Sequence, residues 1–210
     1  MRLNWRHHKE HAFGVYEPAV VNAIHNIVKP GWVCADVGAH LGYITLLLAK
    51  QVGPKGKVIA FEPFPNNFQV LQSNIALNGY KNVVLENKAV MDSSGWVSLK
   101  PLGDDPLPYS TFAHLGSGGC VAVSLDDYWE NRTDRLNFVK IDVEGAEAAV
   151  LRGMERILCQ DRSILLVELH AFDQQGENHP ALQIIRDFNY AVSYLGRRRG
   201  KMHVLAQLKE

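Results

Sequence analysis

The sequence predicts an α/β domain with a mainly parallel sheet, helices on both of its faces and an antiparallel hairpin at one edge. Short apolar runs of strand length alternate with amphipathic helical patterns over residues 32–188, which is typical of parallel strands joined by helices. A turn with two glycines follows the first of these strands, at residues 36–42. The last two apolar runs, residues 190–195 and 203–208, flank a short polar segment and predict the closing hairpin.

Size and charge limit the number of domains and the kinds of partner. The chain has 210 residues, of which 47% are hydrophobic, and this is enough for one domain with a substantial core. We expect residues 1–30 to form an N-terminal extension and a covering helix, and residues 31–210 to form the main domain. Lysine and arginine together number 22, as do aspartate and glutamate. The chain therefore lacks the excess of positive charge that nucleic-acid-binding proteins usually carry.

The cysteines and the apolar runs indicate the compartment. Three cysteines lie far apart without the spacing of metal ligands, which is typical of reduced thiols. The first residues lack the apolar stretch of a secretory signal, and no run approaches the ~20 apolar residues of a membrane span. We therefore expect a cytoplasmic protein without membrane contact.

The expected elements begin with a helix that starts at Pro18. Proline is favoured in the first turn of a helix, and one apolar stripe continues from there to about Val28. Strand and helix patterns then alternate, separated by Gly, Pro and Asn residues. The strands are expected at residues 32–36, 57–62, 83–86, 137–142 and 164–168, and the helices at 41–52, 65–77, 124–129, 146–159 and 180–188.

Two segments between the third and fourth of these strands are less regular. Residues 88–90 and 96–99 flank an Asp-Ser-Ser-Gly turn, and this pattern predicts a small hairpin. Residues 100–119 are rich in Pro, Gly and Ser. Because a loop of this length in a compact domain usually has a function or is disordered, we expect a lid here.

The turn after the first strand predicts a ligand site. Asp36 ends an apolar run, Gly38 and Gly42 follow it, and a helix then begins. Glycines let the backbone bend sharply and let a ligand approach closely. The spacing is D-x-G-x-x-x-G, not the G-x-G-x-x-G of dinucleotide-binding proteins. The turn therefore suits a ligand with a positively charged or hydroxyl-rich part and no pyrophosphate.

Acidic residues end most of the predicted strands, where open α/β sheets bind their ligands. Asp36, Glu62, Asp142 and Glu168 each follow an apolar run, and this repetition is hard to explain by structure alone. Glu62 lies 20 residues after Gly42, where an acid accepts hydrogen bonds from both hydroxyls of a ribose. The simpler interpretation is that Glu62 caps the next helix, although the Pro-x-Pro segment between them makes a poor cap.

These segments resemble those of the FkbM-type methyltransferases, a branch of the class I S-adenosylmethionine-dependent enzymes. The similar segments are Asp36–Thr45, Ala60–Pro63, Lys140–Glu147 and Val167–His170, and the resemblance runs from about Phe13 to Ala206. It implies a Rossmann-like, seven-stranded sheet that ends in an antiparallel hairpin. It also implies O-methylation of small molecules or glycans, with S-adenosylmethionine as the cofactor. The chain is short and leaves little room for a separate substrate-binding domain, so the substrate class stays open.

The resemblance also implies which residues bind the cofactor. The backbone from Gly38 through His40 to Gly42 approaches the methionine part and the ribose. Asp36 orients this turn or meets the amino group through water, and Glu62 holds the ribose hydroxyls. The residues expected near the adenine are Pro63, Phe64, Lys88 and Ala89, and Asp142 is expected beside the cofactor and the acceptor.

Transfer of a methyl group to an alcohol needs in-line geometry and removal of the acceptor's proton. The catalytic candidates are Asp142, Glu144, Glu168 and His170, at the ends of neighbouring strands. His170 is attractive as the general base, because an unperturbed imidazole titrates near ~6.5. The alternative is a divalent ion such as Mg²⁺ or Mn²⁺ on the same groups. Since Mg²⁺ prefers oxygen ligands, we favour a site without metal. The structural alternative is that His170 only bonds Glu168 or the backbone, and that Glu147 only caps or pairs.

The remaining features leave alternatives open. The basic run at residues 197–201 lies at the predicted hairpin tip, where solvated charge is the usual interpretation and an anionic substrate or a partner surface is the alternative. The expected partner is a small-molecule or glycan acceptor. A cofactor-binding accessory protein without catalysis is the second candidate function, and zero net charge disfavours a nucleic-acid methyltransferase. The sequence does not indicate the oligomeric state.

Overall fold

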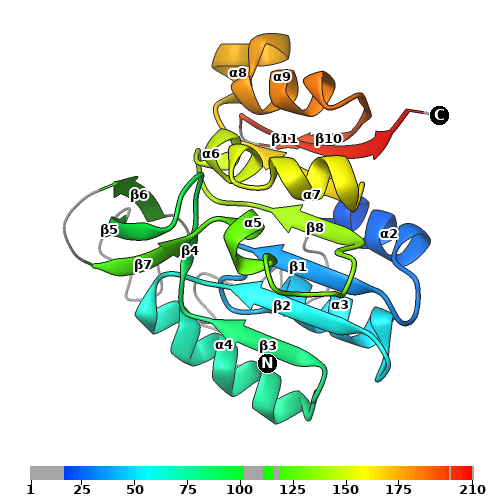
Figure 1. The fold of residues 1–210 in the computed structure, drawn as a ribbon, viewed down its shortest axis with the longest axis vertical. Helices are drawn as coiled ribbons and strands as arrows, with labels where there is room; N and C mark the ends of the chain where they lie inside the picture. The colour runs from blue at the N-terminus through cyan, green and yellow to red at the C-terminus, as the bar shows by residue number, and fades with distance from the viewer. Residues whose placement is uncertain (1–16, 102–110, 116–118, 199, 210) are drawn as a thin grey trace.

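The computed structural model describes residues 17–101, 111–115, 119–198 and 200–209, and its centre is a seven-stranded sheet (Figure 1). The strand order is β10-β11-β9-β8-β1-β2-β3. β11 runs antiparallel to both β9 and β10, and the other neighbours are parallel, which confirms the predicted sheet and its closing hairpin. The strands are β1 (Val33–Val37), β2 (Lys57–Phe61), β3 (Val83–Glu86), β8 (Phe138–Ile141), β9 (Ile164–Leu169), β10 (Tyr190–Arg198) and β11 (Lys201–Leu208).

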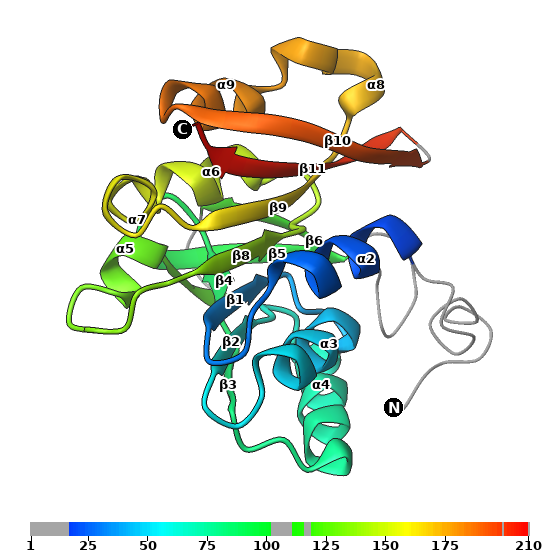
Figure 2. The same ribbon diagram turned by 90° about the vertical axis from the view of Figure 1, so that its right-hand side faces the viewer.

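Helices cover both faces of this sheet, and this explains why its central strands are apolar runs without alternation. In Figure 2, α2, α3 and α4 lie on one face, and α5, α6, α7 and α9 lie on the other. α2 begins at Pro18 as predicted, and its buried Val20 and Ile24 pack with Leu48 of α3. The helices are α2 (Pro18–Ile27), α3 (Tyr43–Val52), α4 (Pro65–Asn78), α5 (Leu125–Tyr128), α6 (Glu147–Arg152), α7 (Glu155–Gln160) and α9 (Pro180–Asp187).

The single helix predicted over residues 146–159 is two helices in the structure, α6 and α7. Gly153 separates them, and a Cβ atom at this position would lie 2.1 Å from the carbonyl oxygen of Met91. The backbone of Met91 therefore passes directly against the helix break, where only glycine fits. This contact is long-range, so the local helical pattern does not reveal it.

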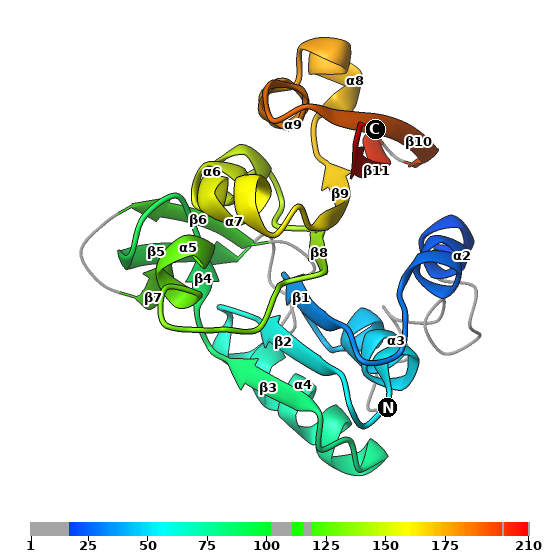
Figure 3. The ribbon, with the colours of Figure 1, turned by 45° about the vertical axis from the view of Figure 1, so that its right-hand side comes forward.

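The small hairpin predicted from residues 88–90 and 96–99 is wrong. β4 pairs in parallel with β7, and β7 also pairs antiparallel with β5. The result is a second sheet of order β4-β7-β5-β6, which packs beside α6 through Ala146 and Ala149 (Figure 3). The prediction failed because the true partner of β4 lies thirty-odd residues further along the chain, as the pairing of Ala89 with Ala122 shows. The strands are β4 (Ala89–Val90), β5 (Gly95–Pro101), β6 (Thr111–Leu115) and β7 (Cys120–Val123).

Three further expectations concern the segments outside the main sheet. The predicted lid at residues 100–119 contains the end of β5 and all of β6, while residues 102–110 and 116–118 lie outside the described residues. The segment between β9 and α9, for which the sequence analysis expects neither a helix nor a strand, forms two short helices, α8 (Phe172–Gln175) and η1 (Gly176–Asn178). Of the predicted N-terminal extension, residues 1–16 also lie outside the described residues. None of the helices described is long and apolar enough to cross a membrane.

Candidate active site

The predicted site residues meet at the carboxyl ends of the central strands. β1 pairs with β2 on one side and with β8 on the other, so the strand order reverses between β1 and β8, where open α/β sheets bind their ligands. The N–H of Asp142 donates a hydrogen bond of 3.0 Å to the carbonyl of Val37. The end of β8 therefore lies directly beside the turn that follows β1.

The glycines of this turn are required by close contacts within the protein. Gly38 has a φ of 80°, and a Cβ atom there would lie 1.8 Å from the carbonyl oxygen of Asp142. A Cβ atom on Gly42, whose φ is 90°, would lie 2.5 Å from Cδ1 of Leu71 in α4. Between them His40 has a φ of 50°, which is rare for a residue other than glycine. The turn is thus fixed before any ligand arrives.

Glu62 follows β2 and holds this turn from the other side. Its side chain is buried and accepts hydrogen bonds from the N–H of His40 at 2.7 Å, from the N–H of Phe64 at 3.0 Å and from Nδ2 of Asn67 at 3.4 Å. Burial raises the pKa of Glu62 to about 7, although these hydrogen bonds lower it. The carboxylate thus connects the turn to the start of α4. Since a carboxylate has about four lone-pair sites, binding of a ribose remains compatible with this structural function.

A buried lysine joins the two sides of the site. Nζ of Lys140 in β8 donates to the carbonyl of Gly38 at 2.9 Å and lies 3.3 Å from Oδ1 of Asp36. It also lies 3.5 Å from Oδ2 of Asp142. Burial lowers the pKa of Lys140, but the charges of Asp36 and Asp142 outweigh it and raise the pKa above its usual range. The sequence analysis missed Lys140, although a charged residue in a buried strand was a visible signal.

Asp36 is fully buried and therefore suits the orienting function predicted for it. Its Oδ2 accepts a hydrogen bond of 2.6 Å from the hydroxyl of Thr45 in α3. Its other oxygen faces Lys140. The carboxylate of Asp36 therefore joins the end of β1 to α3 and to β8, and so holds the turn between β1 and α3 in place.

The four predicted catalytic residues lie together in the structure, and their catalytic functions stay predictions. They are Asp142, Glu144, Glu168 and His170, and one oxygen or nitrogen atom from each lies within 4.8 Å of the others. Nε2 of His170 lies 2.8 Å from Oε2 of Glu144 and 3.4 Å from Oε2 of Glu168. Asp142 lies slightly further away, with Oδ1 at 3.8 Å from the same nitrogen. We call these four residues the acidic cluster.

The crowding of carboxylates in the acidic cluster changes the expected chemistry of His170. Burial lowers the pKa of His170, but the carboxylates of Glu144 and Glu147 outweigh it and raise the pKa to about 10. Burial and the charge of Asp142 raise the pKa of Glu168 to about 9, whereas Lys140 outweighs burial and lowers the pKa of Asp142. An imidazolium, which carries a proton on both nitrogens, cannot accept another one. The surroundings of His170 therefore disfavour the general-base function expected from the sequence.

The backbone at both ends of the acidic cluster is strained. Glu144 after β8 has a φ of 52°, and Ala171 after β9 has a φ of 55°. Such conformations cost residues other than glycine about 1–3 kcal/mol each and gather at functional sites. Both conformations occur just after a strand, β8 or β9, where the side chains of Glu144 and His170 meet.

Two charged residues belong to this region although the sequence analysis left them out of the site. Glu147, at the start of α6, is 1% exposed, and its Oε1 lies 2.6 Å from Nδ1 of His170. Its signal was its position in the sequence, three residues after Glu144. Nζ of Lys201 lies 3.0 Å from Oε1 of Glu144, so solvation is the wrong interpretation for this part of the basic run. Arg197 in the same run forms an ion pair with Asp173.

The residues predicted near the adenine have varied surroundings. Pro63 and Phe64 are partly exposed beside Glu62, at the start of α4. Nζ of Lys88 lies 2.8 Å from Oε2 of Glu86, and Ala89 is buried in β4. The predicted contacts of these four residues with the cofactor stay predictions.

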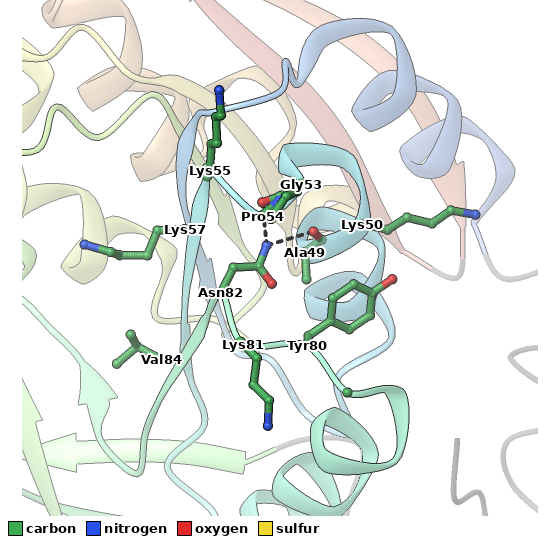
Figure 4. Close-up of a pocket in the computed structure, with 12 residues that line it drawn as sticks. Ala49, Lys50, Gly53, Pro54, Lys55, Lys57, Tyr80, Lys81, Asn82 and Val84 are labelled. Atoms are coloured by element: carbon green, nitrogen blue, oxygen red, sulfur yellow. Dashed lines mark hydrogen bonds between the residues drawn. The ribbon is translucent and has the colours of Figure 1, made fainter.

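A hollow of about 690 Å³ lies at the opposite ends of β2 and β3. Figure 4 shows that four of its lysines, Lys50, Lys55, Lys57 and Lys81, point away from one another. The amide of Asn82 at its centre donates to the carbonyls of Ala49 and Gly53 and so has a structural function. The hollow offers no converging polar groups, and the candidate site stays at the carboxyl ends of the strands.

The fold and the site together define a class, the Rossmann-like methyltransferase fold, with a glycine turn after β1, an acid after β2 and an antiparallel edge. Within this class the chain belongs to the FkbM family of methyltransferases, because the family's domain, described as "Methyltransferase FkbM domain", matches residues 36–197. This match confirms the resemblance seen in the sequence.

Two named relatives show how far the similarity extends. The chain is 31% identical to the hexuronic acid methyltransferase AglP of Haloferax volcanii over 140 residues, which cover 65% of this chain and 55% of that protein. It is 27% identical to the methyltransferase sdnD of Sordaria araneosa over 154 residues, which cover 57% of this chain and 59% of that protein. The chain thus spans less than two thirds of the length of both relatives.

Solved structures share the fold at low sequence identity. The crystal structure of a methyltransferase FkbM from Methylobacillus flagellatus KT has a TM-score of 0.59 and 16% identity, and the match covers 89% of this chain and 50% of that one. Aeropyrum pernix fibrillarin, solved with natively bound S-adenosylmethionine, has a TM-score of 0.55 and 13% identity, with coverage of 89% and 73%. At these identities the likeness shows the shared fold alone.

Proposed function

We propose that this chain uses S-adenosylmethionine to methylate a hydroxyl oxygen of a sugar or of another small hydroxylated metabolite. One observation carries the proposal: the glycine turn after β1 and the acidic cluster after β8 and β9 lie side by side, joined by Lys140. Membership of a methyltransferase family supports methyl transfer as the reaction. The similarity to AglP, named a hexuronic acid methyltransferase, supports a sugar acid as the first acceptor to test.

In this proposal the β1 and β2 side binds the cofactor. The backbone of Gly38, His40 and Gly42 faces its methionine part and ribose, while buried Asp36 keeps the turn in place. Glu62 accepts bonds from the ribose hydroxyls through the lone pairs that its three N–H donors, His40, Phe64 and Asn67, leave free. The residues assigned to the adenine side are Pro63, Phe64, Lys88 and Ala89, and Asp142 lies between cofactor and acceptor.

The β8 and β9 side receives the acceptor. The acceptor oxygen attacks the methyl carbon, the methyl–sulfur bond breaks, and its electron pair stays on sulfur to give S-adenosylhomocysteine. The hydroxyl proton leaves to solvent. Alignment of oxygen, carbon and sulfur lowers the activation barrier by about 7–11 kcal/mol. Holding this alignment is the main task of the protein.

The proposal also includes the cellular compartment and the class of acceptor. Cys34, Cys120 and Cys159 are all unpaired, which fits a reducing compartment such as the cytoplasm. The acceptor is a small molecule or a glycan and not a nucleic acid, because the chain as a whole has no net positive charge.

The test is an acceptor screen with the cofactor present. Hexuronic acids, neutral hexoses, phenols and polyketide-like alcohols are incubated with the protein and S-adenosylmethionine, and S-adenosylhomocysteine and methylated product are measured by mass spectrometry. We expect at least one hydroxylated acceptor to raise turnover and to gain one methyl group. Cofactor binding without turnover on any acceptor would instead favour the accessory protein without catalysis.

A further inference from the structure

We propose that the acidic cluster, formed by Asp142, Glu144, Glu168 and His170, binds one divalent metal ion. Its four ligand atoms come from the ends of two adjacent strands and lie within 4.8 Å of one another. Carboxylate oxygens together with one imidazole nitrogen suit a first-row ion such as Mn²⁺ better than Mg²⁺, which prefers oxygen alone. The geometry thus favours the alternative that the sequence analysis ranked second.

The two nitrogens of His170 have different surroundings, and this asymmetry is the main support. Nδ1 lies 2.6 Å from Oε1 of Glu147, a carboxylate that is itself buried and accepts from the N–H of Gly145. Nε2 is buried and has no hydrogen bond of good geometry, although Oε2 of Glu144 lies only 2.8 Å away. Metal-binding histidines usually have this arrangement, with one nitrogen held by a carboxylate and the other directed at the metal.

Carboxyl groups outnumber the cationic groups around the acidic cluster. Four carboxylates surround His170, those of Asp142, Glu144, Glu147 and Glu168. The lysines that reach them are Lys140, which is shared with buried Asp36, and Lys201, which lies 3.4 Å from Glu168. Glu147 and Glu168 are buried, so crowding of the carboxylates is costly there, and a divalent ion in place of the imidazole proton would offset their excess.

The role of the ion in catalysis rests on the proposed function, but its binding does not. A bound divalent ion lowers the pKa of a coordinated hydroxyl and orients it. It would also reduce the repulsion between the acidic cluster and a negatively charged acceptor such as a hexuronate. Asp142 and Glu168 then hold the ion, and Glu147 keeps the imidazole in the orientation that binding needs.

The experiment measures metal binding without cofactor or acceptor. Chelator-treated protein is titrated with MnCl₂ by calorimetry, and we expect one site per chain in the wild type. His170→Ala and Glu147→Gln should each weaken binding by about 10–100-fold, as changes to ligands and to the residues that support them usually do. The matched control is His203→Ala, since His203 is equally buried and lies 3.5 Å from the other oxygen of Glu168.

The control also separates two neighbouring groups, because His203 lies with Glu17 and Glu168 in a second possible set of ligands. Unchanged binding in His203→Ala supports the acidic cluster, while loss in His203→Ala with full binding in His170→Ala overturns it. If the wild type binds no Mn²⁺, the proposal is wrong. Lys201 is then the cation that pairs with the carboxylates of the cluster. If the variants fail to fold, pulsed electron paramagnetic resonance of the Mn²⁺-loaded wild type decides, because the proposal requires coupling to an imidazole nitrogen.

Methyl transfer by metal-free protein would refute the role of the ion in catalysis and leave the proposed function intact.

Discussion

Carboxylates have opposite surroundings on the two sides of β1. On the β2 side, Glu62 accepts hydrogen bonds from the backbone of His40 and Phe64, which are neutral donors. On the β8 and β9 side, Glu144 and Glu168 face an imidazole, a lysine and each other's charge. In the first arrangement the hydrogen-bond donors to the carboxylate are neutral, and this suits the binding of neutral hydroxyl groups as well. The second has more carboxylates than cations, and this difference supports the proposal that one side binds the cofactor while the other acts on the acceptor.

The largest effect is expected from breaking the link between the two sides. Lys140→Met leaves Asp36 buried without its cation, and we expect the free energy of unfolding to fall by about 3–5 kcal/mol, as is usual when one partner of a buried pair is removed. Urea denaturation measures it. Lys57→Met is the matched control, since Lys57 pairs with Asp134 at the surface and such pairs contribute about 0–1 kcal/mol. Equal losses in both variants would contradict the linking function.

Removal of the acid on the cofactor side should weaken cofactor binding and also lower stability, because His40 and Phe64 lose their hydrogen-bond acceptor. Glu62→Ala loses two ribose hydrogen bonds, and we expect the affinity for S-adenosylmethionine to fall by about 10–100-fold. Turnover at saturating cofactor should change little. Calorimetric titration measures the affinity, and an unchanged value would refute the ribose assignment and leave Glu62 with its structural function only.

Two glycines with the same backbone conformation test the close contact between the sides. Gly38 and Gly31 have φ values of 80° and 84°, but only a Cβ atom on Gly38 would meet another atom, the carbonyl oxygen of Asp142. Gly31→Ala should therefore cost about 1–2 kcal/mol from its backbone conformation alone. Gly38→Ala should cost more and should also weaken cofactor binding. Equal unfolding temperatures for the two variants would show that the contact has no consequence.

The smallest effect expected is a pH dependence of cofactor binding. Glu62 has a pKa of about 7 without ligand, because it is buried, and ribose hydroxyls favour its ionised form. Binding must therefore remove a proton below pH 7, so the affinity should fall by up to about tenfold per pH unit on acidification and level off above it. Calorimetry between pH 5.5 and 8.5, with Glu62→Ala as the control, measures this slope. The same slope in the variant would assign the proton to another group.

The sequence was sufficient for the main sheet because each of its strands and helices is defined by local patterns. Apolar runs predicted β1, β2, β8 and β9, and the acids after them predicted where the site lies. The second sheet was missed because the pairing of β4 with β7 is set by contacts across the chain. The helix break at Gly153 has the same cause, since Met91 requires it.

Within the site, the sequence predicted which residues meet but not their electrostatics. The positions of Glu168 and His170 followed from strand ends. The function expected for His170 depended on an unperturbed imidazole, and only the structure shows the carboxylates that surround it. Lys201 was missed because the hairpin that places it against Glu144 joins segments far apart in sequence.

The most direct test of the division between the two sides is made on one variant, His170→Ala. Its affinity for S-adenosylmethionine and its turnover with the best acceptor are measured on the same protein preparation. We expect turnover to fall by at least about 10²-fold. The variant removes one of the four proposed ligands of the acidic cluster, and loss of a catalytic metal ion costs several kcal/mol of transition-state stabilisation. The cofactor affinity should stay within about threefold of the wild type, a change below ~0.7 kcal/mol, because we assign His170 to the acceptor side. Parallel loss of affinity and turnover, or an active variant, would contradict the account.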